Sequence, residues 1–356
     1  MSQTVAAREV SLRPSGHIRR QRRIERGVVA LLIMIASSGV IITSGIVISL
    51  VQPTWEFFTE RAISGYGTED EFVGLDESAE TGVRDSSALE FADESQIQFE
   101  EPVSLGEFFG STEWYPQYGD GDFGVWPLLV GTFLIMLTAS IVAVPAGIGI
   151  AFFLNQYAKE RTRRIMKPVL ELLAGVPTVV FGYFALFFVG PNIAAKIWPF
   201  SDVGIYSGLA AGITVGLMIL PMMATLADDA MAAVPNSLVE GAFALGATKR
   251  EVCTGVILPA GLSGIMAAII IALSRAIGET TIVLLAAGSQ AVWTFDLGRE
   301  MQTMASYIGF AGIGDQPVDS KGYQTIFAVG LLLFIVTFAL NVLSRRVVAR
   351  FREVYE

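Results

Sequence analysis

Residues 261–287 read GLSGIMAAIIIALSRAIGETTIVLLAA, an apolar stretch that contains two ionisable residues, Arg275 and Glu279. A helix needs about 20 apolar residues to cross the ~30 Å hydrocarbon core of a bilayer, so the stretch is long enough to span it. If it forms one helix, the guanidinium and the carboxylate lie four residues apart, on neighbouring turns. Ionisable groups are costly at membrane depth and mark functional positions there. The stretch therefore predicts a membrane helix that contains a polar site.

The composition of the whole chain supports a membrane protein. Of its 356 residues, 53% are hydrophobic and only 16% are charged, and the mean hydropathy is +0.56. A soluble chain of this length is more polar. The sequence predicts an all-α integral membrane protein with six transmembrane helices, over residues 28–51, 128–154, 169–189, 206–227, 261–287 and 323–343.

The basic residues predict the orientation of these helices. Alternate segments carry seven, five, two and four Lys and Arg, whereas the segments between them carry only five in all. Cytoplasmic loops retain positive charge, so both termini are expected in the cytoplasm. The apolar core of the first span is too long for a signal peptide, and no Ala-x-Ala pattern follows it, so we expect a retained helix.

The predicted spans divide the chain into five parts. These are a cytoplasmic tail over 1–27, a first transmembrane helix over 28–51, an acidic extracytoplasmic loop over 52–124, a transmembrane domain over 125–345 and a cytoplasmic C-terminus over 346–356. Between Glu56 and Asp122 there are eighteen Asp and Glu against two Arg. This segment is either a solvated loop or a docking surface for an external partner, to which Trp114, Tyr115 and Pro116 would contribute aromatic and apolar surface. An acidic surface repels a free anion, which favours delivery by a carrier protein.

Several kinds of chemistry are excluded by what the sequence lacks. Cys253 is the only cysteine and His17 the only histidine, so neither an intrachain disulfide nor a His-based metal site can form. The sequence has no GxxxxGK[ST] motif for binding ATP in the P-loop manner. We therefore expect a non-catalytic chain that binds no metal or cofactor.

A second informative stretch, residues 240–259, reads EGAFALGATKREVCTGVILP. Two short helical patterns are separated by Gly246, which permits a sharp turn, and Pro259 marks the start of the next membrane helix. The pattern indicates either a rigid projection that inserts into another protein or an ordinary amphipathic connector.

This stretch resembles the EAA loop of ABC importer permeases, which has glycine at its seventh position and Leu-Pro at its end. The chain keeps Glu240, Ala242, Gly246, Leu258 and Pro259, whereas Gly241 and Val256 are departures. Residues 168–182, 274–281 and 324–356 look like the permease subunits of phosphate ABC importers, and more like the PstC type than its sister PstA type. The resemblance covers residues 125–356.

The resemblance implies a type I ABC importer permease in a prokaryotic cell (plasma or inner) membrane. It implies a PstA-like sister permease, a PstB-like ATPase dimer that binds ATP and Mg²⁺, and a PstS-like phosphate-binding protein, with membrane lipid around the chain and no role for nucleic acid. The ATPase would contact the loop at Glu240, Gly241, Ala242, Gly246, Ala247, Leu258 and Pro259.

The chemistry of residues 274–281 suits an oxyanion. The Arg275 guanidinium binds oxyanions with two parallel donors, and Ser274, Thr280 and Thr281 add hydroxyl groups. The Glu279 carboxylate can accept a hydrogen bond from protonated phosphate but repels fully ionised sulfate. Alternatively, Arg275 and Glu279 neutralise each other and support the helix. At the level of function, the alternatives are a permease for sulfate, molybdate or another solute, and an ion-coupled secondary transporter.

Three further acidic residues lie near the predicted inner membrane surface. Glu171 is close enough in sequence to Lys167 or Arg164 for a structural ion pair. Asp228 and Asp229 follow the fourth span and serve either solvation or contact with the ATPase.

Overall fold

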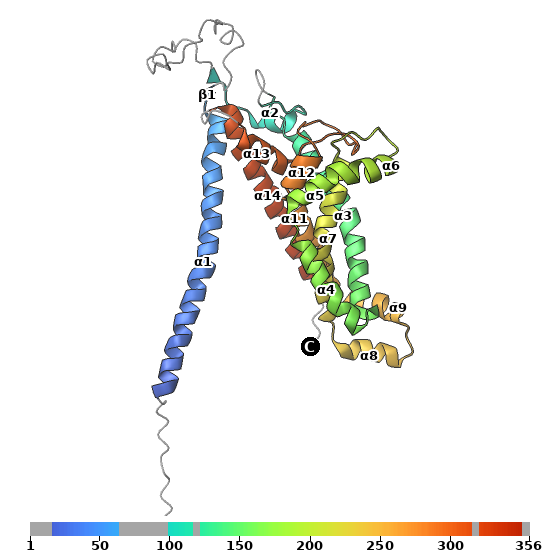
Figure 1. Cartoon of the computed structure of the whole chain (residues 1–356). Coiled ribbons are helices and arrows are strands. Elements are labelled where there is room, and N and C mark those ends of the chain that lie inside the picture. The colour runs from blue at the N-terminus through green and yellow to red at the C-terminus, as the bar shows by residue number, and fades with distance from the viewer. Residues whose placement is uncertain (1–15, 64–98, 117–121, 315–319, 351–356) are drawn as a thin grey trace, which may run out of the picture. The chain divides into compact units, whose positions relative to one another are not determined.

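The computed structural model describes residues 16–63, 99–116, 122–314 and 320–350, and these are largely helical (Figure 1). The chain divides into two compact units, residues 1–52 and residues 53–356, which are described separately. Most of helix α1 (Gly16–Thr59) belongs to the first unit, and within it the segment Ile41–Thr59 is apolar and long enough to span a membrane. Because α1 begins at Gly16, the second half of the predicted tail is helical. Residues 1–15 lie outside the described residues.

Two very short strands interrupt the helical fold of the second unit. Strand β1 (Ala62–Ile63) pairs antiparallel with β2 (Phe99–Glu100). The acidic residues between these strands and residues 117–121 lie outside the described part of the chain. The expected all-α class is therefore right apart from this small pairing.

Five helices of the described chain are apolar and long enough to cross a membrane, and a bent helix pair would be a sixth. The second, fourth and sixth predicted spans match α3 (Trp126–Phe152) with its π-helical continuation η4 (Phe153–Tyr157), α7 (Gly208–Ala232) and α14 (Lys321–Arg350).

The third predicted span was placed too early. Helix α4 (Glu160–Ala174) is a separate amphipathic helix that ends before Pro177, because the residue before a proline avoids helical geometry. The apolar span follows as α5 (Thr178–Phe184), the π-helical η5 (Ala185–Ala194) and α6 (Ala195–Ile197). The apolar residues of 169–174 therefore lie on α4, outside the span.

The fifth predicted span is also not one helix. Helix α11 (Leu262–Ile277) ends at Gly278, and a short helix α12 (Thr281–Ala286) starts after Thr280. At its other end, α11 meets the preceding helical segment, Lys249–Ala260, at an angle of 74°. Glycine at positions 261 and 278 marks both breaks, as expected for a residue of low helix propensity. Helix α13 (Met304–Ile313) then precedes α14.

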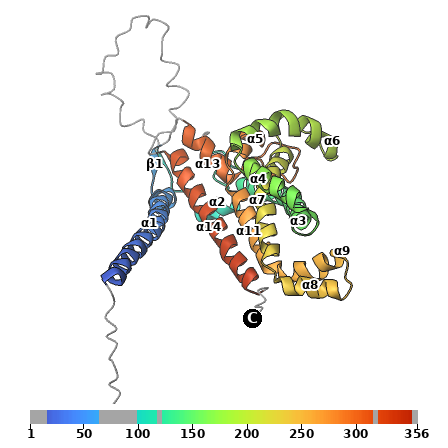
Figure 2. The same cartoon turned by 60° about the horizontal axis from the view of Figure 1, so that its bottom comes forward.

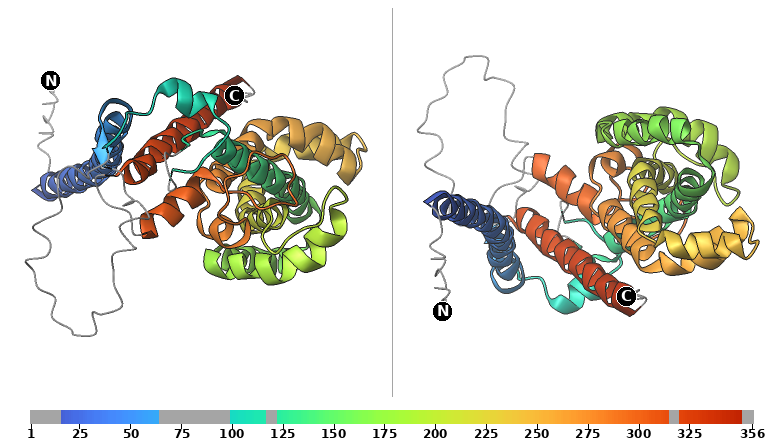
Figure 3. Two further views of the ribbon diagram at one scale, coloured as in Figure 1. Left: turned by 90° about the horizontal axis from the view of Figure 1, so that it is seen from above. Right: turned by 90° about the horizontal axis from the view of Figure 1, so that it is seen from below.

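The main core forms around α7, which packs closely against α3 (Figure 3). A Cβ atom added to Gly212 would come within 2.6 Å of the Thr138 Cβ, and one added to Gly216 within 2.8 Å of the Val142 Cβ. Small residues thus let the two helix backbones approach, as helix pairs in membranes require. Helix α11 packs on α7 as well, so α7 is the central helix of the bundle.

A second core lies at the other end of the second unit from α8 (Asn236–Ala244), near α2 (Leu105–Gly110) and α13 (Figure 1). In it, Phe57 contacts both Phe108 and Phe123 edge to face. The fully buried Lys321 donates hydrogen bonds to the carbonyl oxygens of Phe57 at 3.0 Å and Glu60 at 2.6 Å. A cation at these last carbonyls stabilises the end of α1.

Candidate functional site

Residues 240–259 form a helical hairpin at one end of the bundle, visible as α8 and α9 in Figure 2. Helix α8 ends before Gly246, whose φ of +86° is a conformation that side chains with a Cβ rarely adopt. Helix α9 (Lys249–Val252) then starts with a capping box between Thr248 and Glu251. The expected pair of short helices and the glycine turn are confirmed.

The tip of this hairpin exposes apolar side chains. Leu245 is 91% exposed, and Phe243 is exposed as well. On the opposite side, Val239 and Ala242 pack against the main core. A projection that is anchored on one side and apolar at its tip suits contact with another protein.

The predicted contact residues of the hairpin fall into two sets. Glu240, Gly241, Gly246 and Pro259 are exposed, whereas Ala242, Ala247 and Leu258 are partly buried against the core. Pro259 lies in the short helix α10 (Leu258–Ala260). The chain then bends at Gly261, and the next long helix, α11, starts at Leu262.

Arg275 and Glu279 lie on different elements and form no ion pair with each other. Arg275 is exposed on the last turn of α11 and makes no ion pair or hydrogen bond within the described part of the chain. Glu279 is 7% exposed, and its Oε1 accepts hydrogen bonds from the backbone N–H groups of Thr281 at 3.1 Å and Ile282 at 3.2 Å. The carboxylate therefore caps α12. The alternative in which the two charges neutralise each other on one helix is wrong.

The second carboxylate oxygen of Glu279, Oε2, forms no hydrogen bond within the described residues, and it remains available as an acceptor. Nearby hydroxyl groups have local partners. Ser274 donates to Oδ1 of Asn341 on α14 at 3.0 Å, and Thr280 donates to the Gly278 carbonyl at 3.4 Å. Sequence reasoning did not single out Asn341, although an amide close to the end of an apolar span was a usable signal.

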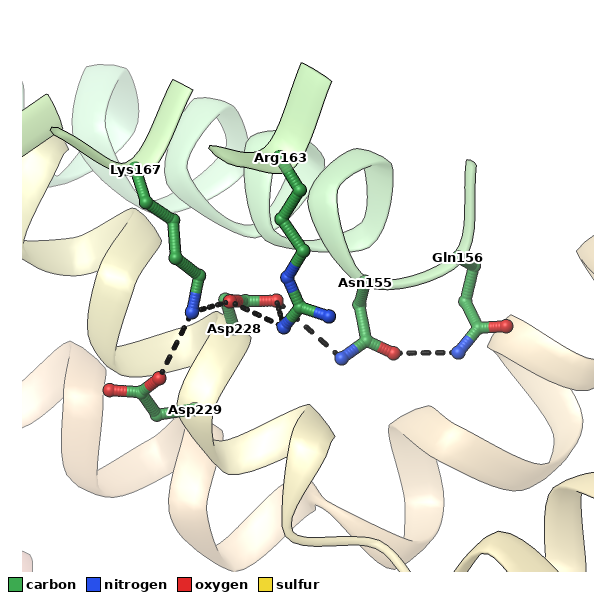
Figure 4. A network of polar contacts seen from close by, with 6 residues as sticks. All are labelled: Asn155, Gln156, Arg163, Lys167, Asp228 and Asp229. Atoms are coloured by element: carbon green, nitrogen blue, oxygen red, sulfur yellow. Dashed lines mark hydrogen bonds and ion pairs between the residues drawn. The ribbon is translucent and has the colours of Figure 1, made fainter. Parts of the chain in front are cut away.

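A buried ionic network joins α4 to the C-terminal end of α7 (Figure 4). The Asp228 side chain has no exposed surface, and its carboxylate binds Lys167 Nζ at 2.6 Å and Arg163 Nη2 at 3.2 Å. Asn155 Nδ2 is 3.5 Å from the same carboxylate, and Lys167 reaches Asp229 at 3.5 Å. Removing one partner of a buried ion pair costs about 3–5 kcal/mol, because a charge remains without compensation.

This network corrects two predictions. Asp228 serves neither solvation nor a surface contact, because it is buried inside the chain. Glu171 is exposed and pairs with neither candidate, because Lys167 binds Asp228 and Arg164 binds Glu160 at 3.4 Å. The spacing of Arg163 and Lys167 on one helical face, with an aspartate inside an apolar helix, was a usable signal.

The loop between α12 and α13 is fixed by carboxylates. Asp296 Oδ1 accepts hydrogen bonds from Trp198 Nε1 at 2.8 Å, Ser201 Oγ at 3.0 Å and the Gly298 N–H at 3.0 Å. Burial acts to raise the pKa of Asp296, but these hydrogen bonds and the charge of Arg299 outweigh it, so the pKa lies below its ordinary value. Sequence reasoning did not single out this contact.

The predicted aromatic group of the outer loop is only partly at the surface. Trp114 is buried and contacts Tyr307 edge to face, with ring centroids 5.0 Å apart. Tyr115 is half exposed, and both residues line a pocket of about 500 Å³ with Pro116. Trp114 is therefore part of the second core rather than a free docking residue.

Comparison with known proteins identifies the family. A model described as binding-protein-dependent transport system inner membrane component matches residues 143–352, more than half of the chain. The chain belongs to this family. It is an inner-membrane, multi-pass permease subunit of an ABC importer.

Two relatives and one solved structure illustrate the similarity of this permease to known proteins. It is 33% identical to the probable ABC transporter permease protein YqgH of Bacillus subtilis (strain 168), over 70% of this chain and 79% of that protein. It is 32% identical to the phosphate transport system permease protein PstC of Xylella fastidiosa (strain 9a5c), over 68% and 78%. A chain of a bacterial transporter that imports alginate matches with a TM-score of 0.50 and 13% identity, over 70% of this permease and 85% of that chain. The last match shows the fold alone.

Proposed function

We propose that this permease forms half of the translocation path of an ATP-driven importer of inorganic phosphate. The observation that carries the proposal is the similarity to proteins named phosphate transport system permease PstC, including one from Mycobacterium tuberculosis at 36% identity over 245 residues. In this proposal a PstA-like permease completes the path, a PstB-like ATPase dimer with ATP and Mg²⁺ receives the loop 240–259, and a PstS-like protein delivers phosphate.

The groups at the break between α11 and α12 support an oxyanion as the solute. Arg275 is exposed on this chain, makes no contact of its own within the described residues and offers a planar pair of donors. Glu279 Oε2 offers an acceptor a short distance along the chain, and an acceptor next to a cation favours an anion that still carries a proton. Ser274, Thr280 and Thr281 are proposed as further path residues.

Phosphate is favoured over sulfate because sulfate has no proton to donate to Glu279. A permease for sulfate, molybdate or another solute keeps the same architecture and remains the alternative. An ion-coupled secondary transporter is not favoured, because the family is one of binding-protein-dependent systems.

Uptake by the purified complex tests the proposal. The chain is co-expressed with a PstA-like permease, a PstB-like ATPase and a PstS-like binding protein and reconstituted in proteoliposomes with ATP inside. We expect uptake of radioactive phosphate that needs both ATP and the binding protein and that excess sulfate does not inhibit. Phosphate uptake without ATP, or preferential uptake of sulfate or molybdate, would contradict the proposal.

A further inference from the structure

Asp228 takes part in no contact proposed for the solute or the ATPase, yet it is the centre of the most buried ionic network described above (Figure 4). Its partners come from two other elements: Asn155 from η4, and Arg163 and Lys167 from α4. A carboxylate without exposed surface cannot lose these partners without becoming an uncompensated buried charge. The ends of η4, α4 and α7 must therefore move together.

The hairpin of residues 240–259 touches the same place. Lys249 Nζ, at the start of α9, donates to the Gln156 carbonyl at 3.2 Å and lies 5.7 Å from the centre of the Tyr157 ring. Gln156 itself donates to Asn155 Oδ1 at 2.6 Å. A displacement of α9 therefore acts on η4 one residue away from a partner of Asp228.

On the other side, α4 leads to the proposed path. Beyond its end the chain turns at residues 175–177 into α5, which packs against α12. A Cβ atom on Gly182 of α5 would come within 2.6 Å of the Leu285 Cδ1 on α12. Glu279 caps the start of α12. Closely packed elements transmit displacement because packed cores deform little.

We propose that Asp228 is the positioning residue of a coupling joint, defined as Asn155, Arg163, Lys167 and Asp228, which transmits displacement of the hairpin 240–259 to α5 and α12. This proposal rests on the proposed function, because it requires an ATPase that acts on the hairpin. The joint contributes no contact to the solute. Weakening the joint separates ATP hydrolysis from transport, while the solute site and the ATPase contact both stay in place.

The test compares phosphate transported per ATP hydrolysed by the reconstituted complex. Arg163→Gln and Asp228→Asn are expected to lower this ratio by roughly fivefold or more, the lower range of allosteric coupling, while the complex still assembles and hydrolyses ATP. Arg164→Gln is the matched control, because Arg164 is on the same helix but its ion pair is with Glu160 and fully at the surface. This control is expected to keep the wild-type ratio.

A double-mutant cycle adds a readout that a merely structural role would not move. Lys249→Met and Arg163→Gln act on one route in our proposal, so their effects on the ratio are expected to be less than additive. Independent effects in assembled complexes would contradict the route. If Asp228→Asn fails to assemble, Arg163→Gln and Lys167→Gln decide, because both side chains are only partly buried. Wild-type ratios in these two assembled variants overturn the joint.

A measurement without solute separates this proposal from the proposed function. In a Cys253→Ser chain, spin labels at the exposed positions Val180 on α5 and Phe338 on α14 report the distance between these helices. ATP binding is expected to change that distance in the wild-type complex and with Arg164→Gln, but not with Arg163→Gln. An unchanged response in Arg163→Gln overturns the joint, whether or not the complex transports phosphate.

Discussion

At the scale of single residues, Glu279 combines two tasks that are usually separate. Its Oε1 caps the short helix α12, and its Oε2 makes no hydrogen bond within the described residues. The position of a functional carboxylate is thereby fixed by the backbone itself. A capping role also explains how a carboxylate is tolerated in an apolar stretch without a paired cation.

Glu279→Gln separates the two tasks. The amide oxygen still accepts from the backbone, although more weakly, and the negative charge disappears. We expect phosphate uptake to fall and the relative uptake of sulfate to rise, measured with a binding protein that accepts both anions. Glu300→Gln is the matched control, because Glu300 Oε1 also accepts from two backbone N–H groups, of Ser289 and Gln290. If both variants lose the same activity with unchanged preference, Glu279 is only a cap.

Because Glu279 and Arg275 form no ion pair, neutralising both is not expected to rescue transport. If the double variant Arg275→Gln with Glu279→Gln regained activity and still preferred phosphate, Glu279 would not be the group that selects phosphate over sulfate.

Arg275→Gln tests the cation. Truncating one member of a buried charged contact typically costs about 2–4 kcal/mol, or roughly 30- to 1,000-fold, and we expect transport to fall by this amount. Arg275→Lys is expected to recover only part of it, because a point charge replaces a planar fork. The measurement is initial uptake rate at equal amounts of assembled complex. Wild-type rates with glutamine would show that Arg275 contributes nothing to the path.

What the sequence could predict at this scale was the identity of Arg275 and Glu279, not their geometry. Ionisable residues in an apolar stretch are conspicuous, but the low helix propensity of Gly278 decides that the helix ends between them. The residue types and the spacing of Arg163 and Lys167 marked possible partners of Asp228, but the pairing itself could not be predicted from the sequence. These partners come from residues 65 and 61 positions earlier in the chain, and only the packing of α4 on α7 brings them together.

At the scale of elements, the hairpin 240–259 depends on one backbone conformation. Gly246 has a φ of +86°, and a Cβ atom there would meet nothing within 4 Å. Lack of space is therefore not the reason for glycine at this turn. The reason for glycine is the left-handed conformation, which costs other residues about 1–2 kcal/mol.

Gly246→Ala and Gly246→Asp should therefore both distort the hairpin. We expect reduced uptake together with reduced copurification of the ATPase at normal levels of this chain in the membrane. Gly255→Ala is the matched control, because Gly255 lies in the same stretch 240–259, is equally open, has no positive φ and is not one of the predicted ATPase contacts. Normal assembly and transport with Gly246→Asp would refute the docking role of the hairpin.

The loop between α12 and α13 should respond to acid through Asp296. Its pKa is below the ordinary 3.8, so the folded state binds this proton less readily than the unfolded state does. The stabilisation is therefore complete above about pH 4 and is lost as the pH falls through the folded pKa. We expect the difference in thermal unfolding between wild type and Asp296→Asn to shrink over that range. The exposed neighbour Asp202, changed to Asn, is the control, and an equal pH response in both variants would contradict the assignment.

Sequence patterns located elements better than their ends. The hairpin was predicted because Gly246 and Pro259 are strong local signals. The third span was misplaced because an apolar face of α4 runs into the apolar α5, and hydropathy alone does not separate an amphipathic helix from a span. Pro177 was the available boundary signal.

At the scale of the whole molecule, charge is divided very unevenly along the chain. Residues 56–122 hold eighteen Asp and Glu against two Arg, whereas the chain as a whole carries a formal charge of −10. The remainder is therefore net positive by six. Whether the acidic segment docks a carrier protein or only holds water stays a prediction, since most of it lies outside the described residues.

The last prediction concerns the path of the chain through the membrane. Five helices of the described residues are long and apolar enough to cross, and the bent pair around Gly261 adds a sixth only if it crosses as one span. The two counts differ in an observable way, because an even number of spans places both termini on one side of the membrane and an odd number on opposite sides. The basic residues around the predicted inner loops favour six.

Single cysteines at positions 2, 86 and 356 in a Cys253→Ser chain test this count. With six spans and cytoplasmic termini, a membrane-impermeant maleimide added outside intact cells should label Ser86→Cys only, whereas all three positions react after the membrane is opened. Labelling of Glu356→Cys from outside, without labelling of Ser2→Cys, would mean that the bent pair does not cross. In that case the bent pair would be re-entrant, and Arg275, on the last turn of α11, could line the path only from one side of the membrane. The position of the C-terminus therefore bears directly on the proposed solute site.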